Sequence, residues 1–133
     1  MDDRGLPAGY QLKPDWELTP RQARAALAAP NPPILLDVRT PDEHAAARID
    51  GSVLIPLQEL EKRLDELEAD NGSRRRPIIV HCYAGGRSLK AAALLRASGF
   101  ADVRSMAGGI DAWSRAVDPS VPRYTHKPAP AKP

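Results

Sequence analysis

Cysteine is almost missing from this chain, since Cys82 is the only one among 133 residues. One thiol cannot form an internal disulfide, which is typical of proteins from reducing compartments, so we expect a cytoplasmic location. Long apolar runs are missing too, and none approaches the ~18 residues that a membrane span requires. The acidic start Met1-Asp2-Asp3-Arg4, which no apolar segment follows, does not match a secretory signal. We therefore expect no membrane partner.

Metal ligands and strong charge are scarce as well. The chain has 3 histidines and a net charge of +2, an excess too small to favour nucleic-acid binding. His44 and His126 have no neighbours at metal-ligand spacing, so we expect neither a metal site nor a cofactor. His81 precedes Cys82 on a predicted strand, where successive side chains point to opposite faces. It is therefore interpreted as packing and not as the base of a Cys–His pair.

The chain does contain a regular alternation of short apolar runs and helical segments. The predicted strands cover residues 16–18, 34–36, 53–55, 77–81 and 103–105. The predicted helices cover residues 20–29, 57–70, 88–98 and 109–116, with a short further helix that begins with a capping box of Thr40 and Glu43. Strands joined in this way by helices favour an α/β fold, with a central, mainly parallel five-stranded sheet and helices on both faces.

The ends of the chain differ in composition from its centre. Residues 1–15 are rich in glycine and proline and are predicted to form an extended arm, whereas residues 16–118 are predicted to form one domain. Residues 119–133 are rich in proline and lysine, which predicts an extended or disordered tail. The basic run Arg74-Arg75-Arg76 is interpreted as a solvated turn, with docking of a partner as the alternative.

Cys82 ends a predicted strand and is followed by a glycine-containing loop, an arginine and an alanine-rich helix. Backbone N–H groups, the guanidinium and the helix N-terminus would all stabilise negative charge on the sulfur or on an anion beside it. The alternative is a buried structural cysteine, which is common for free cysteines. The glycines and the cation that follow at once favour a reactive thiolate.

The spacing in this loop is the sharpest signal in the sequence. Four residues separate Cys82 from Arg87, whereas cysteine phosphatases use five in a similar strand–loop–helix arrangement, so this ring should suit a thiolate carrying one extra sulfur better than a phosphate. The loop resembles that of single-domain members of the rhodanese family, whose six-residue loop opens with the persulfide-forming cysteine. The matching residues are Cys82-Tyr83-Ala84-Gly85-Gly86-Arg87, followed by Ser88.

Two further segments are similar to that family, so the resemblance runs from about Leu18 to Trp113. Residues 35–44, with 49–52 and 55–57, resemble the N-terminal signature, and residues 103–113 resemble the C-terminal one. One departure is visible, because the family usually has Gly-His-Ile where this chain has Ala47-Arg48-Ile49. This position lies outside the loop, so we expect it to alter packing and not chemistry.

The resemblance implies a sulfurtransferase that carries sulfane sulfur on Cys82. The expected donor is a small anion, thiosulfate or a persulfide, and the expected acceptor is a thiol or cyanide; a protein sulfur donor or carrier is a further option. The end of the similar region also resembles rhodanese domains fused to adenylating enzymes that supply sulfur to ubiquitin-like carriers. Two alternatives stay open: a non-catalytic rhodanese-like module for binding or regulation, and a cysteine phosphatase or arsenate reductase.

Roles follow for the residues around Cys82. Backbone groups of residues 83–88 are expected to bind the substrate sulfur, and Gly85 and Gly86 allow the loop to curl because glycine accepts positive φ. Arg87 either binds an anionic donor or braces the loop, and Ser88 either donates its hydroxyl or caps the helix. On the neighbouring strand end lie Asp37, Arg39 and Glu43, which are interpreted as structural, with a catalytic role as the alternative. Asp37 and Arg39 are expected to pair, since buried charges survive mainly as pairs.

Overall fold

The computed structural model describes residues 1–71 and 74–126; residues 72–73 and 127–133, which include the end of the predicted tail, lie outside the described part. The fold is built on a five-stranded sheet in the order β1-β5-β4-β2-β3. Its strands are β1 (Glu17–Leu18), β2 (Ile34–Asp37), β3 (Val53–Leu54), β4 (Ile78–His81) and β5 (Val103–Met106). Every paired neighbour is parallel, which confirms the predicted α/β class.

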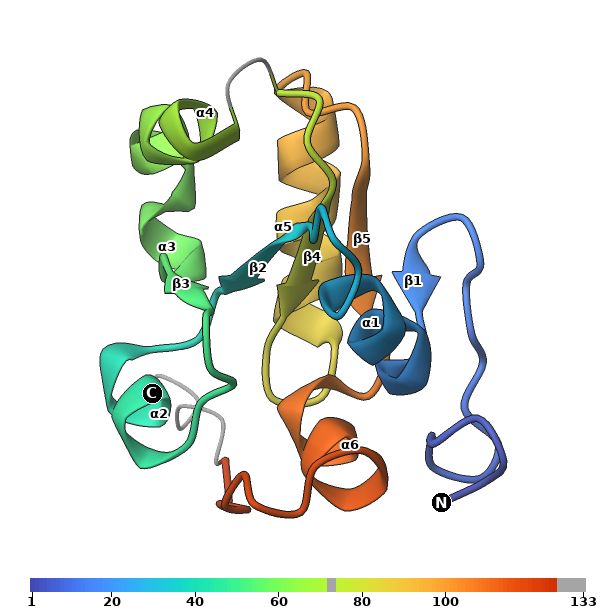
Figure 1. Ribbon diagram of the computed structural model, residues 1–133. Helices are drawn as coiled ribbons and strands as arrows, with labels where there is room; N and C mark the ends of the chain where they lie inside the picture. Colours follow the sequence, from blue (N-terminus) through green and yellow to red (C-terminus); the bar gives the residue numbers. More distant parts are fainter. Residues whose placement is uncertain (72–73, 127–133) are drawn as a thin grey trace, which may run out of the picture.

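Helices cover both faces of the sheet (Figure 1). The helical segments are α1 (Pro20–Leu27), α2 (Pro41–Ala46), α3 (Leu57–Leu60), the 3-10 turn η1 (Glu61–Arg63), α4 (Leu64–Asn71), α5 (Gly86–Ala97) and α6 (Gly109–Ala116). One core cluster joins the sheet to α3, α4 and α5 through Leu60, Leu67 and Leu95. The other joins it to α1 and α6 through Ala23 and Trp113. Successive side chains along the inner strands point alternately into one cluster and into the other.

Two helix predictions need correction. The segment expected as one helix over residues 57–70 is divided by the 3-10 turn η1, although Leu60 and Leu67 remain fully buried as its leucine spacing requires. Helix α5 begins at Gly86 and not at Ser88, because Gly85 adopts φ +118 and caps the helix there. The first turn of α5 is therefore part of the loop that follows Cys82. The predicted capping box of Thr40 and Glu43 is present at the start of α2.

The N-terminal arm and the described part of the tail both pack on the domain. In the N-terminal arm, Leu6 is fully buried, and the Asp3 carbonyl accepts a hydrogen bond from Arg21 of α1 at 2.7 Å. In residues 119–126, which contain neither helix nor strand, Val121 is buried and its carbonyl accepts from the Ser114 hydroxyl at 2.5 Å. The described part of the tail is thus led across α6 towards α2. Within residues 1–71 and 74–126, no helix has both the length and the apolar character to cross a membrane.

Candidate functional site

Two strand ends meet at one edge of the sheet, as the sequence predicts. Cys82 directly follows β4, and the register of β2 and β4 places Asp37 beside His81. Cys82 shares a core cluster with Val80, on the α5 side of the sheet, and is 1% exposed. Ligands of parallel sheets bind beyond the carboxyl ends of the strands, so this edge is the place to look for chemistry.

The sulfur of Cys82 is surrounded by hydrogen-bond donors. The backbone N–H groups of Gly85 and Ser88 donate to Sγ at 3.1 Å and 3.4 Å, and the Ser88 hydroxyl lies 3.4 Å from it. Both N–H groups belong to the cap and first turn of α5, where the helix dipole favours negative charge. Tyr83, Ala84 and Gly86 complete the loop. These donors point at the sulfur from the loop and can hydrogen-bond negative charge that develops there.

Ser88 is tied to a residue that the sequence did not single out. Its hydroxyl donates to the Gly85 carbonyl at 3.1 Å and lies 2.6 Å from the hydroxyl of Ser105 on β5. Both serines are fully buried. Because Gly85 is the N-cap of α5, the capping alternative for Ser88 does not hold. The sequence marks Ser105 only as a polar residue between the apolar residues Val103 and Met106 of a strand.

Arg87, the last residue of the loop, is paired with Glu43 of α2. Its two terminal nitrogens lie 2.6 Å and 3.0 Å from the two carboxylate oxygens of Glu43. A bidentate pair of this kind is strong and geometrically fixed. Burial alone would raise the pKa of Glu43, but hydrogen bonds from Arg87 and Tyr124 lower it to about 2. Glu43 is therefore ionised at neutral pH and braces the loop arginine.

The strand end of β2 holds a fully buried ion pair. Arg39 donates to both carboxylate oxygens of Asp37, at 2.9 Å and 2.7 Å, and also to the carbonyls of Glu43 and Ala47. Both side chains are 0% exposed. Burial raises the pKa of Asp37, yet the hydrogen bonds from Arg39 hold it below its usual range. The pair predicted from sequence is present, and it fixes the segment that carries Glu43.

This geometry is accompanied by a match to a known family over most of the chain. The family model of the Rhodanese-like domain matches residues 19–116, a range that includes Glu43, the Cys82 loop and Ser105. The chain belongs to the rhodanese-like family. The resemblance drawn from the three sequence segments is thereby confirmed, and the parallel sheet with its Cys82 loop is a rhodanese-like domain.

Curated relatives of this rhodanese-like domain include enzymes named for sulfur transfer. Adenylyltransferase and sulfurtransferase MOCS3-1 of Zea mays is 35% identical over 126 residues, which are 93% of this chain and 27% of that protein. Sulfurtransferase of Allochromatium vinosum is 34% identical over 82 residues, 62% of this chain and 72% of that protein. The chain thus spans about a quarter of the length of the adenylyltransferase relatives that it matches.

Solved structures agree with these relatives. Human Single Domain Sulfurtransferase TSTD1 superimposes with a TM-score of 0.65 at 29% identity, covering 74% of this chain and 95% of that one. Thiosulfate sulfurtransferase from Pseudomonas aeruginosa superimposes with a TM-score of 0.66 at 35% identity, over 76% of this chain and 19% of that one. Together the comparisons support sulfurtransferase chemistry at the level of the superfamily.

The described part of the tail, residues 119–126, contacts the site, which the sequence did not indicate. The Tyr124 hydroxyl donates to Glu43 at 2.7 Å and accepts from Arg39 at 3.0 Å. Its ring meets the ring of Tyr83 edge-on, with centroids 5.1 Å apart. The ring of His126 lies 5.6 Å from the ring of Tyr83, centroid to centroid, and its Nδ1 lies 3.4 Å from a carboxylate oxygen of Glu43. A lone tyrosine in a proline-rich tail gives no sequence signal for such a contact.

The N-terminal arm reaches the same loop from another side. The Tyr10 hydroxyl donates to Glu17 at 2.5 Å, and a Cβ placed on Gly85 would lie 3.4 Å from that hydroxyl. Burial and the hydrogen bond to Glu17 raise the pKa of Tyr10, so its proton stays in place at neutral pH. Tyr10 therefore supports the turn at Gly85 as a neutral group.

His81 is buried, as its packing interpretation requires, whereas two arginines of the basic run bond to the protein and do not form a merely solvated turn. Burial lowers the pKa of His81 to about 4, and neither ring nitrogen has a hydrogen-bond partner among the described residues. Arg74 donates to the Ser98 carbonyl and lies over the ring of Phe100 at 5.0 Å, while Arg76 donates to the Pro32 carbonyl at 3.0 Å. Both arginines thus hold the turn before β4, far from Cys82.

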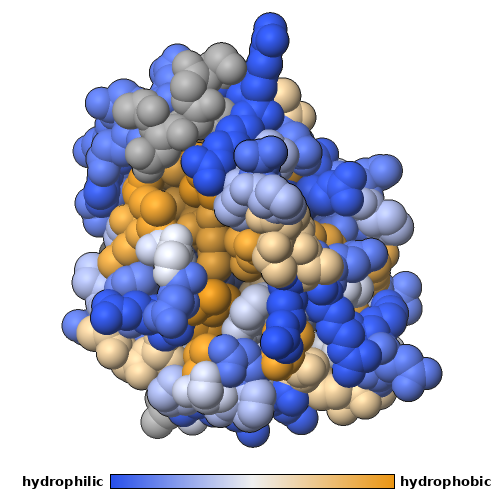
Figure 2. All heavy atoms as spheres, in the orientation of Figure 1, coloured by the Kyte–Doolittle hydropathy of each residue, from blue (hydrophilic) through white to orange (hydrophobic). Residues whose placement is uncertain are grey.

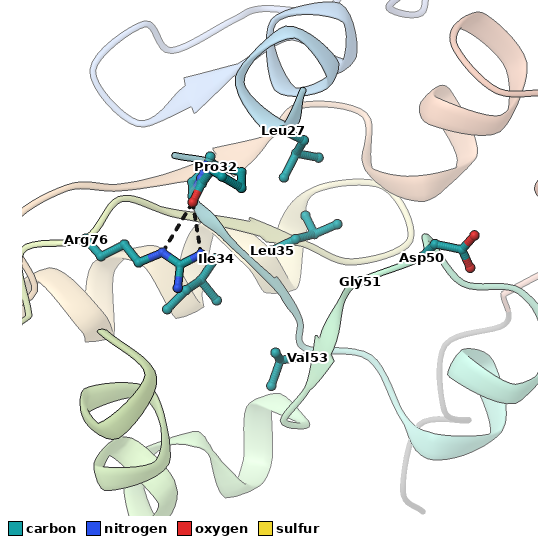
Figure 3. Close-up of a pocket in the computed structure, with 9 residues that line it drawn as sticks. Leu27, Pro32, Ile34, Leu35, Asp50, Gly51, Val53 and Arg76 are labelled. Carbon is teal, nitrogen blue, oxygen red and sulfur yellow. Dashed lines mark hydrogen bonds between the residues drawn. The ribbon is translucent and has the colours of Figure 1, made fainter. Parts of the chain in front are cut away.

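A cavity of about 330 Å³ opens at the amino ends of β2 and β3, away from Cys82 (Figure 3). It is lined by apolar side chains such as Leu27, Leu35 and Val53, with Arg76 bonded across its rim to Pro32. Figure 2 shows the apolar residues that gather in the middle of this face, ringed by hydrophilic ones. Since no thiol or hydroxyl of the described residues lines this cavity, we assign the chemistry to the Cys82 loop.

Proposed function

We propose that this protein transfers sulfane sulfur through a persulfide on Cys82. The observation that carries the proposal is the position of Sγ, which accepts hydrogen bonds from the N–H groups of Gly85 and Ser88 at the start of α5. The thiolate is the form of cysteine that attacks sulfur, and these donors stabilise it. The relatives named sulfurtransferases support the reaction class.

The reaction has two displacement steps. In the first, the Cys82 thiolate attacks the outer sulfur of the donor, the new S–S bond forms, and the old bond breaks so that sulfite or a thiolate leaves with the electron pair. In the second, cyanide or an acceptor thiolate attacks the outer sulfur of the persulfide and releases the Cys82 thiolate. Between the steps, the loop N–H groups hold the negative charge of the outer sulfur. The donor oxidises the Cys82 thiolate to the persulfide and the acceptor returns it to the thiolate, so no other oxidant or reductant is needed.

The proposal also covers the cellular location of the protein, its donor and acceptor, and the roles of the residues around Cys82. We expect a cytoplasmic protein, because its single thiol must stay reduced between turnovers. The adenylyltransferase relatives suggest that a protein sulfur donor or carrier replaces thiosulfate or cyanide in the cell. Residues 83–88 form the substrate-binding loop in this proposal, whereas Asp37, Arg39 and Glu43 hold its surroundings.

Mass spectrometry tests the proposal directly. Incubation with thiosulfate should add the mass of one sulfur atom, about 32 Da, to the protein, and cyanide should remove it. The Cys82→Ser variant should neither gain this mass nor form thiocyanate. Hydrolysis of p-nitrophenyl phosphate by the same preparation, with no sulfur added to Cys82, would replace this function with the phosphatase alternative. A folded protein inert to both substrates would favour the binding module.

A further inference from the structure

The positive charge of the loop arginine is already matched by Glu43. The Arg87 side chain is 25% exposed and that of Glu43 is 10% exposed, so the pair lies at the edge of the site and is shielded from much of the solvent. The hydrogen bonds to Arg87 and Tyr124 keep Glu43 ionised at neutral pH. An anion that approaches the loop therefore meets a cation and an anion fixed side by side, and not a free guanidinium.

Other charged groups near this pair have partners as well. Arg39 is bound by Asp37, and Arg123 and Arg115 share Asp111, at 3.3 Å and 3.8 Å. The remaining neighbours are the rings of Tyr83, Tyr124 and His126, which pack against one another beside Glu43. Among the described residues, the basic side chains within ion-pair distance of Glu43 are Arg87 and His126. The loop N–H groups can hold one negative sulfur, whereas the Glu43 carboxylate that is fixed on Arg87 opposes a second negative charge beside it.

We infer that this site takes its sulfur from singly charged organic sulfane donors, such as alkyl persulfides, in preference to the thiosulfate dianion, and that Glu43 sets this preference. The inference rests on the proposed function, because it concerns the donor of the same transfer. The terminal sulfur of a persulfide is held by the N–H groups of the loop, while its carbon part meets the aromatic rings. The sulfite half of thiosulfate carries a further charge, which the Glu43 carboxylate repels.

Two sulfur donors that differ by one negative charge test the effect of the second charge of thiosulfate. Methanethiosulfonate has a methyl group in place of one charged oxygen of thiosulfate, so the two donors present the same outer sulfur with one and with two negative charges. With cyanide as the acceptor, the wild-type protein should show a higher kcat/KM for methanethiosulfonate. In the Glu43→Gln variant, kcat/KM for thiosulfate should rise roughly tenfold through a lower KM, while that for methanethiosulfonate should change less than about threefold.

The Glu43→Gln change is conservative for the fold. Glutamine at the same position of the other capping box, Gln22 after Thr19, already bonds the N-cap backbone in this chain. Asp42→Asn is the matched control, since Asp42 is an exposed carboxylate on the same helix and the change alters the net charge equally. This control should leave the ratio of the two donors unchanged. A change in Asp42→Asn as large as that in Glu43→Gln would overturn the role of Glu43.

A double variant keeps the inference falsifiable if Glu43→Gln is unstable. Arg87→Gln leaves Glu43 unmatched and should lower the ratio of thiosulfate to methanethiosulfonate turnover. The combined Arg87→Gln and Glu43→Gln variant removes a neutral pair and should restore the wild-type ratio, even if both rates fall. A ratio that stays constant across these variants, in a protein that still forms the Cys82 persulfide, overturns the inference alone. Failure of the wild type to form a persulfide with either donor overturns the proposed function itself.

Discussion

Gly109 lies so close to Tyr83 that a Cβ at position 109 would overlap the Tyr83 carbonyl and stand 2.6 Å from the carbonyl oxygen of Cys82. The next two residues of α6, Ile110 and Asp111, donate their N–H groups to the carbonyls of Cys82 and Tyr83 at 2.9 Å and 3.1 Å. In a trans peptide the C=O and the following N–H point in opposite directions. Helix α6, which Figure 1 shows next to the loop after β4, thus turns the N–H groups of Tyr83 and Ala84 away from itself.

This contact predicts that Gly109→Ala damages the loop. The methyl group cannot fit against a backbone carbonyl, and Gly109 also adopts φ +61, so either α6 or the loop must shift. We expect a loss of about 1–3 kcal/mol in the free energy of unfolding and at least a roughly tenfold loss of sulfur transfer. Urea denaturation and thiocyanate formation measure the two effects. Gly51→Ala is the control, because Gly51 has φ +83 and an added Cβ there would meet nothing within 4 Å. Equal losses in both variants would show that the contact of Gly109 with the Cys82 loop is not the cause.

Ser105 should influence the reactivity of Cys82 through Ser88. Each hydroxyl has one proton, and the side chain of Ser105 has Ser88 as its hydrogen-bond partner among the described residues. Ser105 therefore donates to Ser88, which leaves the Ser88 proton for the Gly85 carbonyl or for the sulfur. Ser105→Ala should slow the alkylation of Cys82 by iodoacetamide about threefold at neutral pH, where progress curves give the alkylation profile.

Two further variants separate this effect from simple destabilisation. Ser105→Thr keeps the hydroxyl and should restore the alkylation profile. Ser98→Ala removes a hydroxyl that bonds the Leu94 carbonyl at the far end of α5, and it should leave the profile unchanged. If Ser105→Ala and Ser98→Ala give the same profile as the wild type, Ser105 has only a packing role.

The contrast between predicted and unpredicted parts follows from the range of the interactions. Strands were predictable because each apolar run is local, and the Asp37–Arg39 pair was predictable because its members are two residues apart. The bond between Glu43 and Arg87 spans 44 residues, and the one between Tyr124 and Glu43 spans 81. Local patterns mark Glu43 only as a helix cap. Its ion pair with Arg87 depends on which strands become neighbours in the sheet.

The length of the loop should decide between sulfur and phosphoryl chemistry. One glycine inserted between Gly85 and Gly86 gives the five-residue spacing of the cysteine phosphatases and moves the N–H groups of α5 away from Sγ. Hydrogen bonds weaken quickly beyond ~3.2 Å, so we expect sulfur transfer to fall at least roughly tenfold, about 1.4 kcal/mol of transition-state stabilisation. Affinity for phosphate or arsenate should rise, as measured by inhibition of alkylation. Unchanged sulfur transfer after the insertion would show that ring size does not select the reaction.

The burial of His81 predicts a pH dependence of stability. Burial lowers its pKa from the ordinary 6.5 to about 4, so between these values the unfolded chain binds a proton that the folded protein does not. The free energy of unfolding should therefore be fully present above pH 6.5 and fall by about 3 kcal/mol as the pH drops to 4. Urea denaturation at pH 7, 5.5 and 4 measures this slope, and His81→Leu should abolish it. Glu43, whose pKa is lowered from 4.5 to about 2, acts in a lower window, with stability lost as the pH falls through about 2. A slope between pH 7 and 4 that persists in His81→Leu would show that another group carries it.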